Sequence, residues 1–284
     1  MNLIKKKPDW IRVKFSIGKN YQKIKNLIFL HKLNTICQSG NCPNIGECWG
    51  KGVATFMILG SICTRSCKFC GVKTGKPDNI DWKEPEKIAK SIKILNLNHV
   101  VITSVNRDDL KDMGTYIWEQ TIIKIKELNP KITIETLIPD FRGNKKIIDR
   151  IIKLNPEIIS HNVETVYRLT KEVRIQAKYD RSLFVLKYIK EENTKIRTKT
   201  GIMLGLGETK EEVLETMQDI KHSKVDILTI GQYLQPSRKH FPVRFFVSPK
   251  EFLEYEKIGL KMGFKYVESG PLVRSSYHAE KHVL

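Results

Sequence analysis

Short apolar runs alternate with amphipathic stretches along most of the chain. Continuous apolar runs of this length predict strands that are buried on both faces, as in parallel sheets. The stretches between them repeat their apolar residues at helical spacing. The expected strands are residues 54–59, 99–105, 131–138, 157–163, 199–206 and 226–234. The expected helices are residues 84–95, 116–128, 145–154, 181–191, 210–221 and 249–262.

The regular order of strand and helix predicts a series of βα units. Six units lie between residues 54 and 262, fewer than the eight of a closed barrel. We therefore predict an α/β fold, a partial (βα)6 TIM-like barrel, with its active site at the carboxyl ends of the strands. The residues before the first strand show no strong periodicity. The expected parts are a cluster-binding N-terminal extension, the barrel and a C-terminal segment: residues 1–52, 53–265 and 266–284.

Composition and charge narrow the classes of protein. The 284 residues are 40% hydrophobic, enough for a sizeable core, and no apolar run approaches the ~18 residues of a membrane span. The N-terminus is basic at Lys5, Lys6 and Lys7, but Pro8 and Asp9 follow without an apolar stretch. A signal peptide is therefore not expected, and a cytoplasmic location is the default. The net charge of +19 favours lysines spread over solvated faces, ahead of a nucleic-acid or acidic protein partner.

The six cysteines form two tight triplets. The first is Cys37, Cys42 and Cys48, and the second is Cys63, Cys67 and Cys70. Disulfides are not expected in a chain with no sign of export. Cysteines grouped three and three instead indicate thiolate ligands of a metal or of iron–sulfur clusters.

The second triplet has the spacing C-x3-C-x2-C and follows the first expected strand. Three thiolates can hold a cubane cluster and leave one iron open, whereas a structural zinc site wants four ligands. A zinc site completed by a histidine, or three buried cysteines, is the alternative. With Phe69 before its last cysteine, the segment resembles the radical S-adenosylmethionine (SAM) superfamily. That resemblance implies a [4Fe–4S] cluster that binds SAM and, when reduced, splits it into methionine and a 5′-deoxyadenosyl radical, with Phe69 near the cofactor.

The first triplet has the spacing C-x4-C-x5-C, with Pro43 and Asn44 after its second cysteine, and resembles the lipoyl synthase family. The likeness is looser at residues 38–41 but extends over nearly the whole chain, including residues 7–10, 54–63, 101–110, 135–143, 161–162, 204–209, 231–237 and 274–277. In that family a serine of the Arg-Ser-Ser-Tyr motif is the fourth ligand of an auxiliary [4Fe–4S] cluster, and by position this is Ser276. Without the family, Ser275 and Ser276 would indicate a turn or a helix cap.

The family implies a complete reaction. Two sulfur atoms are inserted by radical chemistry at C6 and C8 of an octanoyl chain on a carrier-protein lysine, and the auxiliary cluster is the sulfur donor. The second triplet and Ser276 would be catalytic, and the implied cofactors are two [4Fe–4S] clusters and SAM. The implied partners are octanoylated lipoyl-carrier domains (2-oxoacid dehydrogenase E2 subunits and the glycine cleavage H protein), an electron donor such as flavodoxin or ferredoxin, and a cluster-repair protein. Neither a membrane nor a nucleic acid is expected as a partner.

Three polar residues are candidates for binding SAM. Arg174 could form a bidentate pair with the carboxylate, although a surface charge is equally open. Asn162 and Glu164 end the fourth expected strand, where they could contact SAM or cap a helix.

Some strand-end residues give weaker signals. Gly205 and Gly207 could let the backbone approach SAM, but a glycine-rich turn is weak evidence by itself. Gln232 and Tyr233 could line a substrate channel at the end of the sixth strand. His161 is more often a strand-end polar residue than a ligand.

Two other classes of protein share part of this pattern. A tRNA-modifying radical SAM methylthiotransferase would use two clusters, but its first three cysteines spread over a longer N-terminal domain and an RNA-binding β-domain follows the barrel. A non-enzymatic zinc-bearing nucleic-acid-binding protein fits the βα series and the triplets poorly. Metal content separates these classes, with about eight iron per chain against about one or two zinc.

Overall fold

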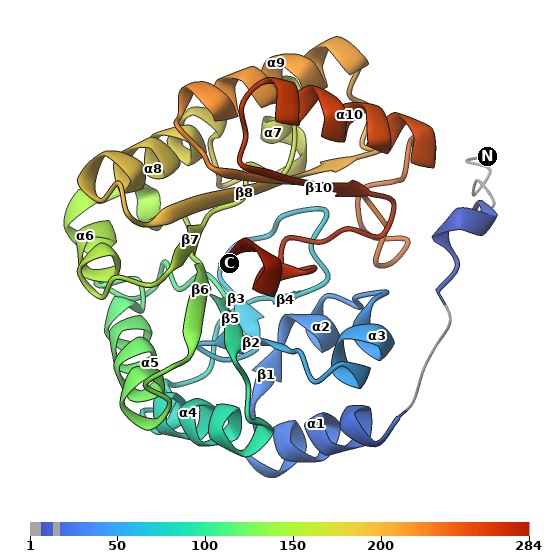
Figure 1. Cartoon of the computed structure of the whole chain (residues 1–284). Helices are drawn as coiled ribbons and strands as arrows, with labels where there is room; N and C mark the ends of the chain where they lie inside the picture. Colours follow the sequence, from blue (N-terminus) through green and yellow to red (C-terminus); the bar gives the residue numbers. More distant parts are fainter. Residues whose placement is uncertain (1–6, 14–17, 284) are drawn as a thin grey trace.

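The computed structural model describes residues 7–13 and 18–283 and shows a curved sheet covered on its outer face by helices (Figure 1). Lys5 and Lys6 of the basic N-terminus lie outside these residues. The sheet has eight strands in the order β1-β2-β5-β6-β7-β8-β9-β10. Neighbours from β2 to β10 pair in parallel, whereas β1 pairs with β2 antiparallel. Because β1 and β10 are the two edges, the barrel is open, and the predicted fold class is confirmed.

The parallel strands follow the apolar runs of the sequence. The strands are β1 (Asn34–Thr35), β2 (Thr55–Ile58), β5 (His99–Ser104), β6 (Thr133–Leu137), β7 (Ile158–Ser160), β8 (Arg197–Leu204), β9 (Ile227–Gln232) and β10 (Tyr266–Gly270). Six of them are the predicted strands. β10 was not predicted, because Val267 is its one buried residue and no apolar run marks it. It pairs with β9 and so extends the sheet into the segment that we expected to follow the barrel.

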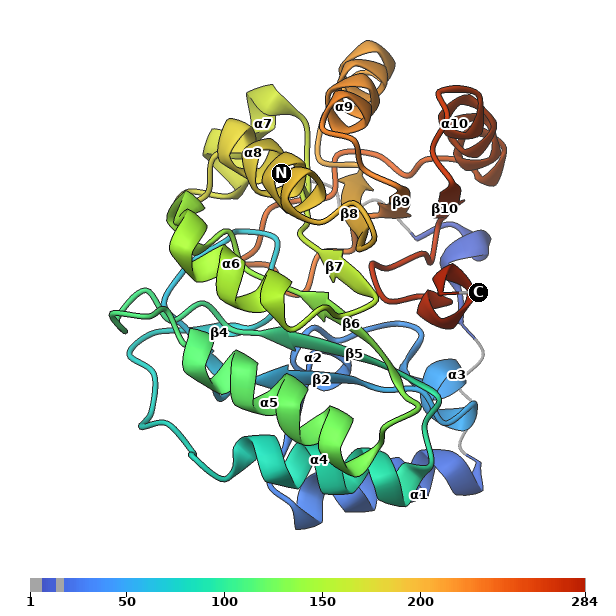
Figure 2. The same cartoon turned by 60° about the vertical axis from the view of Figure 1, so that its left-hand side comes forward.

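The outer layer consists of helices that pack on the sheet (Figure 2). The six predicted helices are α4 (Glu84–Leu95), α5 (Thr115–Leu128), α6 (Lys145–Lys153), α8 (Tyr179–Glu192), α9 (Lys210–His222) and α10 (Pro249–Lys261). Capping boxes fix the starts of α9 and α10, where Thr209 and Ser248 each accept the N3 backbone N–H. The unpredicted α7 (Tyr167–Val173) lies between β7 and α8.

Helices occupy the N-terminal extension, where the sequence showed no periodicity. They are η1 (Asp9–Ile11), α1 (Lys19–Leu30), α2 (Ile36–Ser39) and α3 (Ile45–Gly50). α1 buries only Ile24, Leu27 and Ile28 of its twelve residues. Such a narrow apolar face leaves little trace in the sequence.

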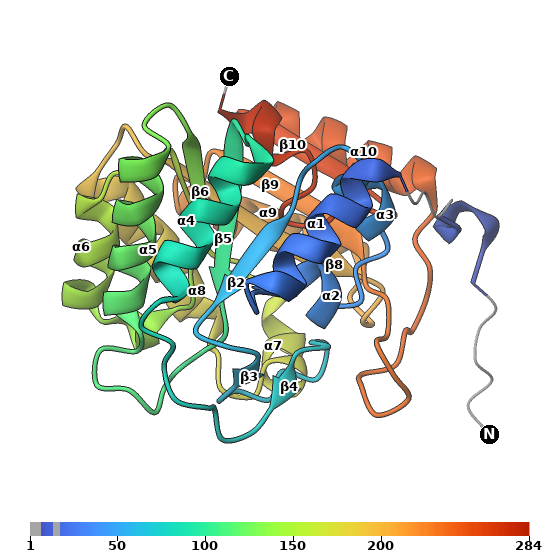
Figure 3. The same cartoon turned by 90° about the horizontal axis from the view of Figure 1, so that it is seen from below.

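Two segments reach opposite ends of the barrel (Figure 3). The second cysteine triplet lies in the loop that contains the short pair β3 (Ile62–Cys63) and β4 (Lys73–Thr74), beyond the carboxyl end of β2. After β10 the chain turns back toward the other end and finishes in η3 (Ala279–His282). There the carbonyl of His282 accepts a hydrogen bond from Arg197, at the start of β8.

The core consists of two apolar clusters between the sheet and its helices. One includes Phe56 and Trp118 from the β2–β6 half, and the other includes Leu228 and Phe252 from the β8–β10 half. Within residues 7–13 and 18–283, no helix combines the length and apolar character needed to cross a bilayer.

Candidate functional site

A cavity of about 660 Å³ occupies the barrel at the carboxyl ends of its strands. Side chains of the second cysteine triplet, of strands β2, β5, β6, β8 and β9, of the loop after β7 and of the C-terminal segment border it. This is the end at which a partial barrel of this kind is expected to hold its active site.

All three cysteines of the second triplet face this cavity, as does Phe69. The sulfur of Cys63 accepts hydrogen bonds from the backbone N–H of Arg65 (3.4 Å) and of Asn106 (3.3 Å). Burial raises the pKa of Cys67 to about 11 and that of Cys70 to about 12. Thiols with such pKa values stay protonated near neutral pH unless a metal centre replaces the proton.

The loop between β9 and α10 is hydrogen-bonded to the far side of the cysteine loop. The backbone N–H of Phe241 donates to the carbonyl of Lys68 (2.8 Å), and Nε2 of His240 lies 3.0 Å from the carbonyl oxygen of Cys70. Tyr233 contributes through its hydroxyl, which donates to the carbonyl of Phe241 (2.6 Å). Tyr233 also lines the large cavity, as predicted.

The structure brings Asn162, Glu164 and Arg174 to the wall of the large cavity. Nδ2 of Asn162 donates to Glu164 Oε1 (3.0 Å), while Asn162 Oδ1 is buried and accepts no hydrogen bond. Nη1 of Arg174 donates to the carbonyl of Val163 (2.7 Å). Burial raises the pKa of Glu164, and the nearby charge of Arg174 opposes that rise. Charged groups of both signs at the cavity wall fit a ligand that carries an amino and a carboxylate group, as SAM does.

His161 also borders the cavity, but both of its ring nitrogens are engaged inside the protein. Nδ1 lies 2.9 Å from the carbonyl oxygen of Ile138, and Nε2 lies 3.0 Å from Ser182 Oγ. Burial lowers the pKa of His161 to about 4, so the ring is neutral near pH 7. It is a structural residue, as the sequence favoured.

Gly205 and Gly207 do not border the large cavity. Gly205 has φ +100°, and a Cβ there would lie 2.1 Å from Gln232 Nε2 and 2.6 Å from the carbonyl oxygen of Phe245. Close packing around Gln232, which lines the cavity, therefore explains this glycine. That either glycine contacts SAM stays a prediction.

The first triplet borders a second, small cavity next to the large one. Cys37, Cys42 and Cys48 line it together with Ser276, whereas Ser275 lines the large cavity. Burial raises the pKa of Cys37 to about 11 and that of Cys48 to about 12.

Arg274 borders both cavities, and its charge acts on Cys42. The segment that carries it is held to the N-terminal extension, because Asn44 Nδ2 donates to the carbonyl of Leu272 (2.7 Å). The hydroxyl of Tyr277 lies 3.4 Å from both carboxylate oxygens of Glu47. The fourth candidate ligand thus joins the first triplet across 228 residues of sequence.

Sequence reasoning missed Arg65, Arg274 and Gly231 as residues of the site. Arg65 carries a local signal, since it stands inside the cysteine motif. Gly231 carries no local signal, because its role depends on a segment distant in the sequence that packs directly over it. Across the described parts of the chain, no group of three or more His, Cys, Asp or Glu side chains is placed to hold a single metal ion.

Comparisons with known proteins show the family of the chain. The radical SAM superfamily model matches residues 57–220. The chain is 64% identical to a lipoyl synthase of Flavobacterium psychrophilum, covering 98% of this chain and 96% of that protein. It is 63% identical to a mitochondrial lipoyl synthase of Nematostella vectensis, covering 98% and 95%.

Among solved structures, SuiB of Streptococcus suis bound to S-adenosylmethionine has a TM-score of 0.60 at 15% identity, covering 79% of this chain and 54% of that one. HydG of Carboxydothermus hydrogenoformans has a TM-score of 0.54 at 15% identity, covering 93% and 76%. These two likenesses show the fold. The superfamily match implies one [4Fe–4S] cluster and SAM as cofactors. On these sequence matches, the chain belongs to the lipoyl synthase family of radical SAM enzymes.

Proposed function

We propose that the protein inserts two sulfur atoms, at C6 and C8, into an octanoyl chain that is amide-linked to a lysine of a carrier protein. The observation that carries this proposal is the small cavity, where Ser276 meets the three cysteines of the first triplet. A second cluster site beside a radical SAM site is what a sulfur-inserting enzyme requires. The names of the close relatives support the same reaction.

The residues of the large cavity would have separate roles in binding the SAM cluster and SAM itself. Cys63, Cys67 and Cys70 would hold it and leave one iron for SAM. When bound, cluster and SAM supply the radical that removes hydrogen from an unactivated carbon. Arg174 and Glu164 would orient SAM by its charged groups, because buried Arg174 and half-buried Glu164 both face the cavity.

Ser276 would complete the auxiliary cluster, which the first triplet holds, with an oxygen ligand. A serine oxygen is harder than a thiolate and matches iron–sulfur chemistry less well. It would therefore leave more readily when sulfur is withdrawn. Arg274, at the border of both cavities, would keep a positive charge beside Cys42 while sulfur is withdrawn from the cluster.

Apolar side chains of the large cavity suit an octanoyl chain. Met57, Val72, Leu137 and Ile138 border it and offer an apolar wall to the chain. The substrates would be octanoylated carrier domains of 2-oxoacid dehydrogenase E2 subunits and of the glycine cleavage H protein. A flavodoxin or ferredoxin would supply electrons, and a cluster-repair protein would restore the second cluster.

The test is an anaerobic assay of the reconstituted protein with dithionite, SAM and an octanoyl-lysine peptide, read by mass spectrometry. We expect 5′-deoxyadenosine and a peptide that carries two added sulfur atoms. SAM cleavage without sulfur on the peptide would refute the proposed reaction, and tRNA would then be tried as the substrate. No SAM cleavage by protein that holds about eight iron would contradict the cluster assignment as well.

Two neighbouring serines provide a matched pair of variants. Ser276→Ala should lower the sulfur added to the peptide at least tenfold while SAM is still cleaved. Ser275→Ala removes the same hydroxyl from the wall of the other cavity and should leave the second cluster in place. Equal cluster content and equal sulfur insertion in both variants would argue against ligation by Ser276.

A further inference from the structure

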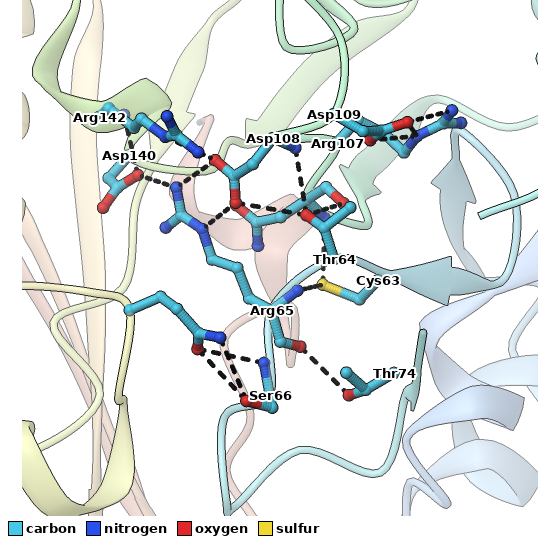
Figure 4. Close-up of polar contacts among 12 residues, drawn as sticks. Cys63, Thr64, Arg65, Ser66, Thr74, Arg107, Asp108, Asp109, Asp140 and Arg142 are labelled. Atoms are coloured by element: carbon cyan, nitrogen blue, oxygen red, sulfur yellow. Dashed lines mark hydrogen bonds and ion pairs between the residues drawn. The ribbon is translucent and has the colours of Figure 1, made fainter. Parts of the chain in front are cut away.

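A largely buried network of ion pairs anchors the first half of the cysteine loop (Figure 4). Arg65 stands between Cys63 and Cys67, and its side chain is 6% exposed. Its Nε and Nη2 donate to the two carboxylate oxygens of Asp108, at 2.6 and 2.8 Å. Nη2 also lies 2.8 Å from Oδ1 of Asp140. One guanidinium therefore holds two carboxylates.

Each carboxylate is itself anchored to the barrel. Asp108 follows β5 and pairs with Arg142 at 3.2 Å. Asp140 follows β6, its side chain is fully buried, and it pairs with Arg181 of α8 at 3.2 Å. The loop is thus tied to the carboxyl ends of two neighbouring strands, β5 and β6.

Hydrogen bonds of the backbone around Arg65 connect this ion-pair network to the cysteines. Its N–H donates to the sulfur of Cys63, and its carbonyl accepts from the hydroxyl of Thr74 (3.2 Å). The N–H of Thr64 donates to the carbonyl of Asn106 (3.1 Å), and the N–H of Asn106 donates to the same Cys63 sulfur. A shift of Arg65 would therefore move a donor away from this thiol.

We propose that Arg65, through Asp108 and Asp140, is a positioning residue that fixes where the loop presents Cys63 and Cys67. Arg65 also borders the large cavity, but its Nε and Nη2 are paired with carboxylates, so we assign its role to the loop and not to SAM. A planar fork is required, because a lysine ammonium cannot bind the two oxygens of Asp108 side by side. This inference rests on the proposed role of the second triplet as cluster ligands.

The test compares Arg65→Lys with the control Arg150→Lys. Arg150 of α6 grips Glu119 of α5 with the same two nitrogens, at 2.7 and 2.5 Å, in the outer helix layer. The first measurement is amide hydrogen exchange of the metal-free protein, which does not depend on the cluster. We expect exchange of residues 61–75 to rise at least tenfold in Arg65→Lys and to stay unchanged in Arg150→Lys.

The second measurement is the EPR spectrum of the reconstituted, reduced protein with and without SAM. We expect the change in the spectrum that SAM produces to be reduced or broadened in Arg65→Lys alone. Asp140→Asn keeps the shape of the side chain and removes one partner, so it should raise loop exchange by less than Arg65→Lys. If Arg65→Lys fails to fold, Asp140→Asn still has to show this local rise.

Two results would overturn the proposal. One is loop exchange in Arg65→Lys and Asp140→Asn equal to that of Arg150→Lys. The other is exchange that rises evenly over the whole barrel, since the network would then serve general stability. A failure of the proposed reaction is distinguishable: wild-type protein would add no sulfur to the peptide, while the local rise in exchange would remain.

Discussion

Gly231→Ala tests how the C-terminal segment is seated. Gly231 lies in β9 beside Gly270 of β10, and the chain at Val273 passes directly over it. A Cβ on Gly231 would lie 2.1 Å from the carbonyl oxygen of Val273 and 3.3 Å from Nη1 of Arg274. Ordinary contact begins near 3.4 Å, so the carbonyl would have to move by roughly 1.3 Å. A backbone carbonyl has no rotamer by which to avoid this contact.

The shift should reach Ser276, which follows Val273 by three residues. Overpacking of this kind costs about 1–3 kcal/mol of unfolding free energy. We expect the terminal segment to move and the barrel to stay folded, because β10 is an edge strand. Ser276 would then leave the small cavity. Three thiolates would then hold the auxiliary cluster without a fourth ligand, so iron content should fall below about eight per chain, toward about four, and SAM cleavage should persist while sulfur insertion falls at least tenfold.

Iron and sulfide content, EPR and the peptide assay check this expectation. The control is Gly50→Ala, because Gly50 follows Cys48 by two residues and a Cβ there meets nothing within 4 Å. The control should hold wild-type iron. Wild-type iron and wild-type sulfur insertion in Gly231→Ala would refute the reasoning.

Three further predictions concern titratable groups. Burial raises the pKa of Glu84 from 4.5 to about 7, although its carboxylate accepts the N–H of Leu59. Metal-free protein should therefore lose up to about 3 kcal/mol of stability as pH rises from 4.5 through 7, and Glu84→Gln should remove that loss in urea unfolding at pH 5 and 8. Burial lowers the pKa of His161 from 6.5 to about 4, so stability should fall as pH falls through this range, and the same assay on His161→Gln should show a flatter curve. Iron loading at pH 7 should release protons to an indicator dye, because burial holds the pKa of Cys37 at about 11 and that of Cys70 at about 12; loading without proton release would contradict buried thiols as ligands.

The sequence predicted the barrel where hydrophobic patterning is strong. Central parallel strands are buried on both faces, so β5 and β9 appear as continuous apolar runs. The edge strand β10 buries only Val267 and has no such run. α1 was missed for a similar reason, since three buried residues in twelve leave a weak periodicity.

Candidate ligands were predictable where their chemistry is local. Cys63, Cys67 and Cys70 lie within eight residues, so their spacing is visible in one segment. Arg65 stands in the same segment, but its partner Asp108 is 43 residues away, and only the order of strands brings them together. Gly205 shows how a glycine can have more than one explanation. Its glycine suggested approach to a ligand, whereas the structure explains it by packing against Gln232.

The two proposed cluster sites also differ in what must fold before each is complete. The second triplet needs its own loop and the neighbouring strand ends. The small cavity needs Ser276, whose segment is held by Asn44 of the N-terminal extension and, at its end, by Arg197 of β8. Closing so long a loop costs entropy that contacts of the folded barrel must offset. The small cavity is therefore complete only when both ends of the chain are seated on the barrel, which is why a single added methyl group at Gly231 should weaken the site at the small cavity and spare the one at the large cavity.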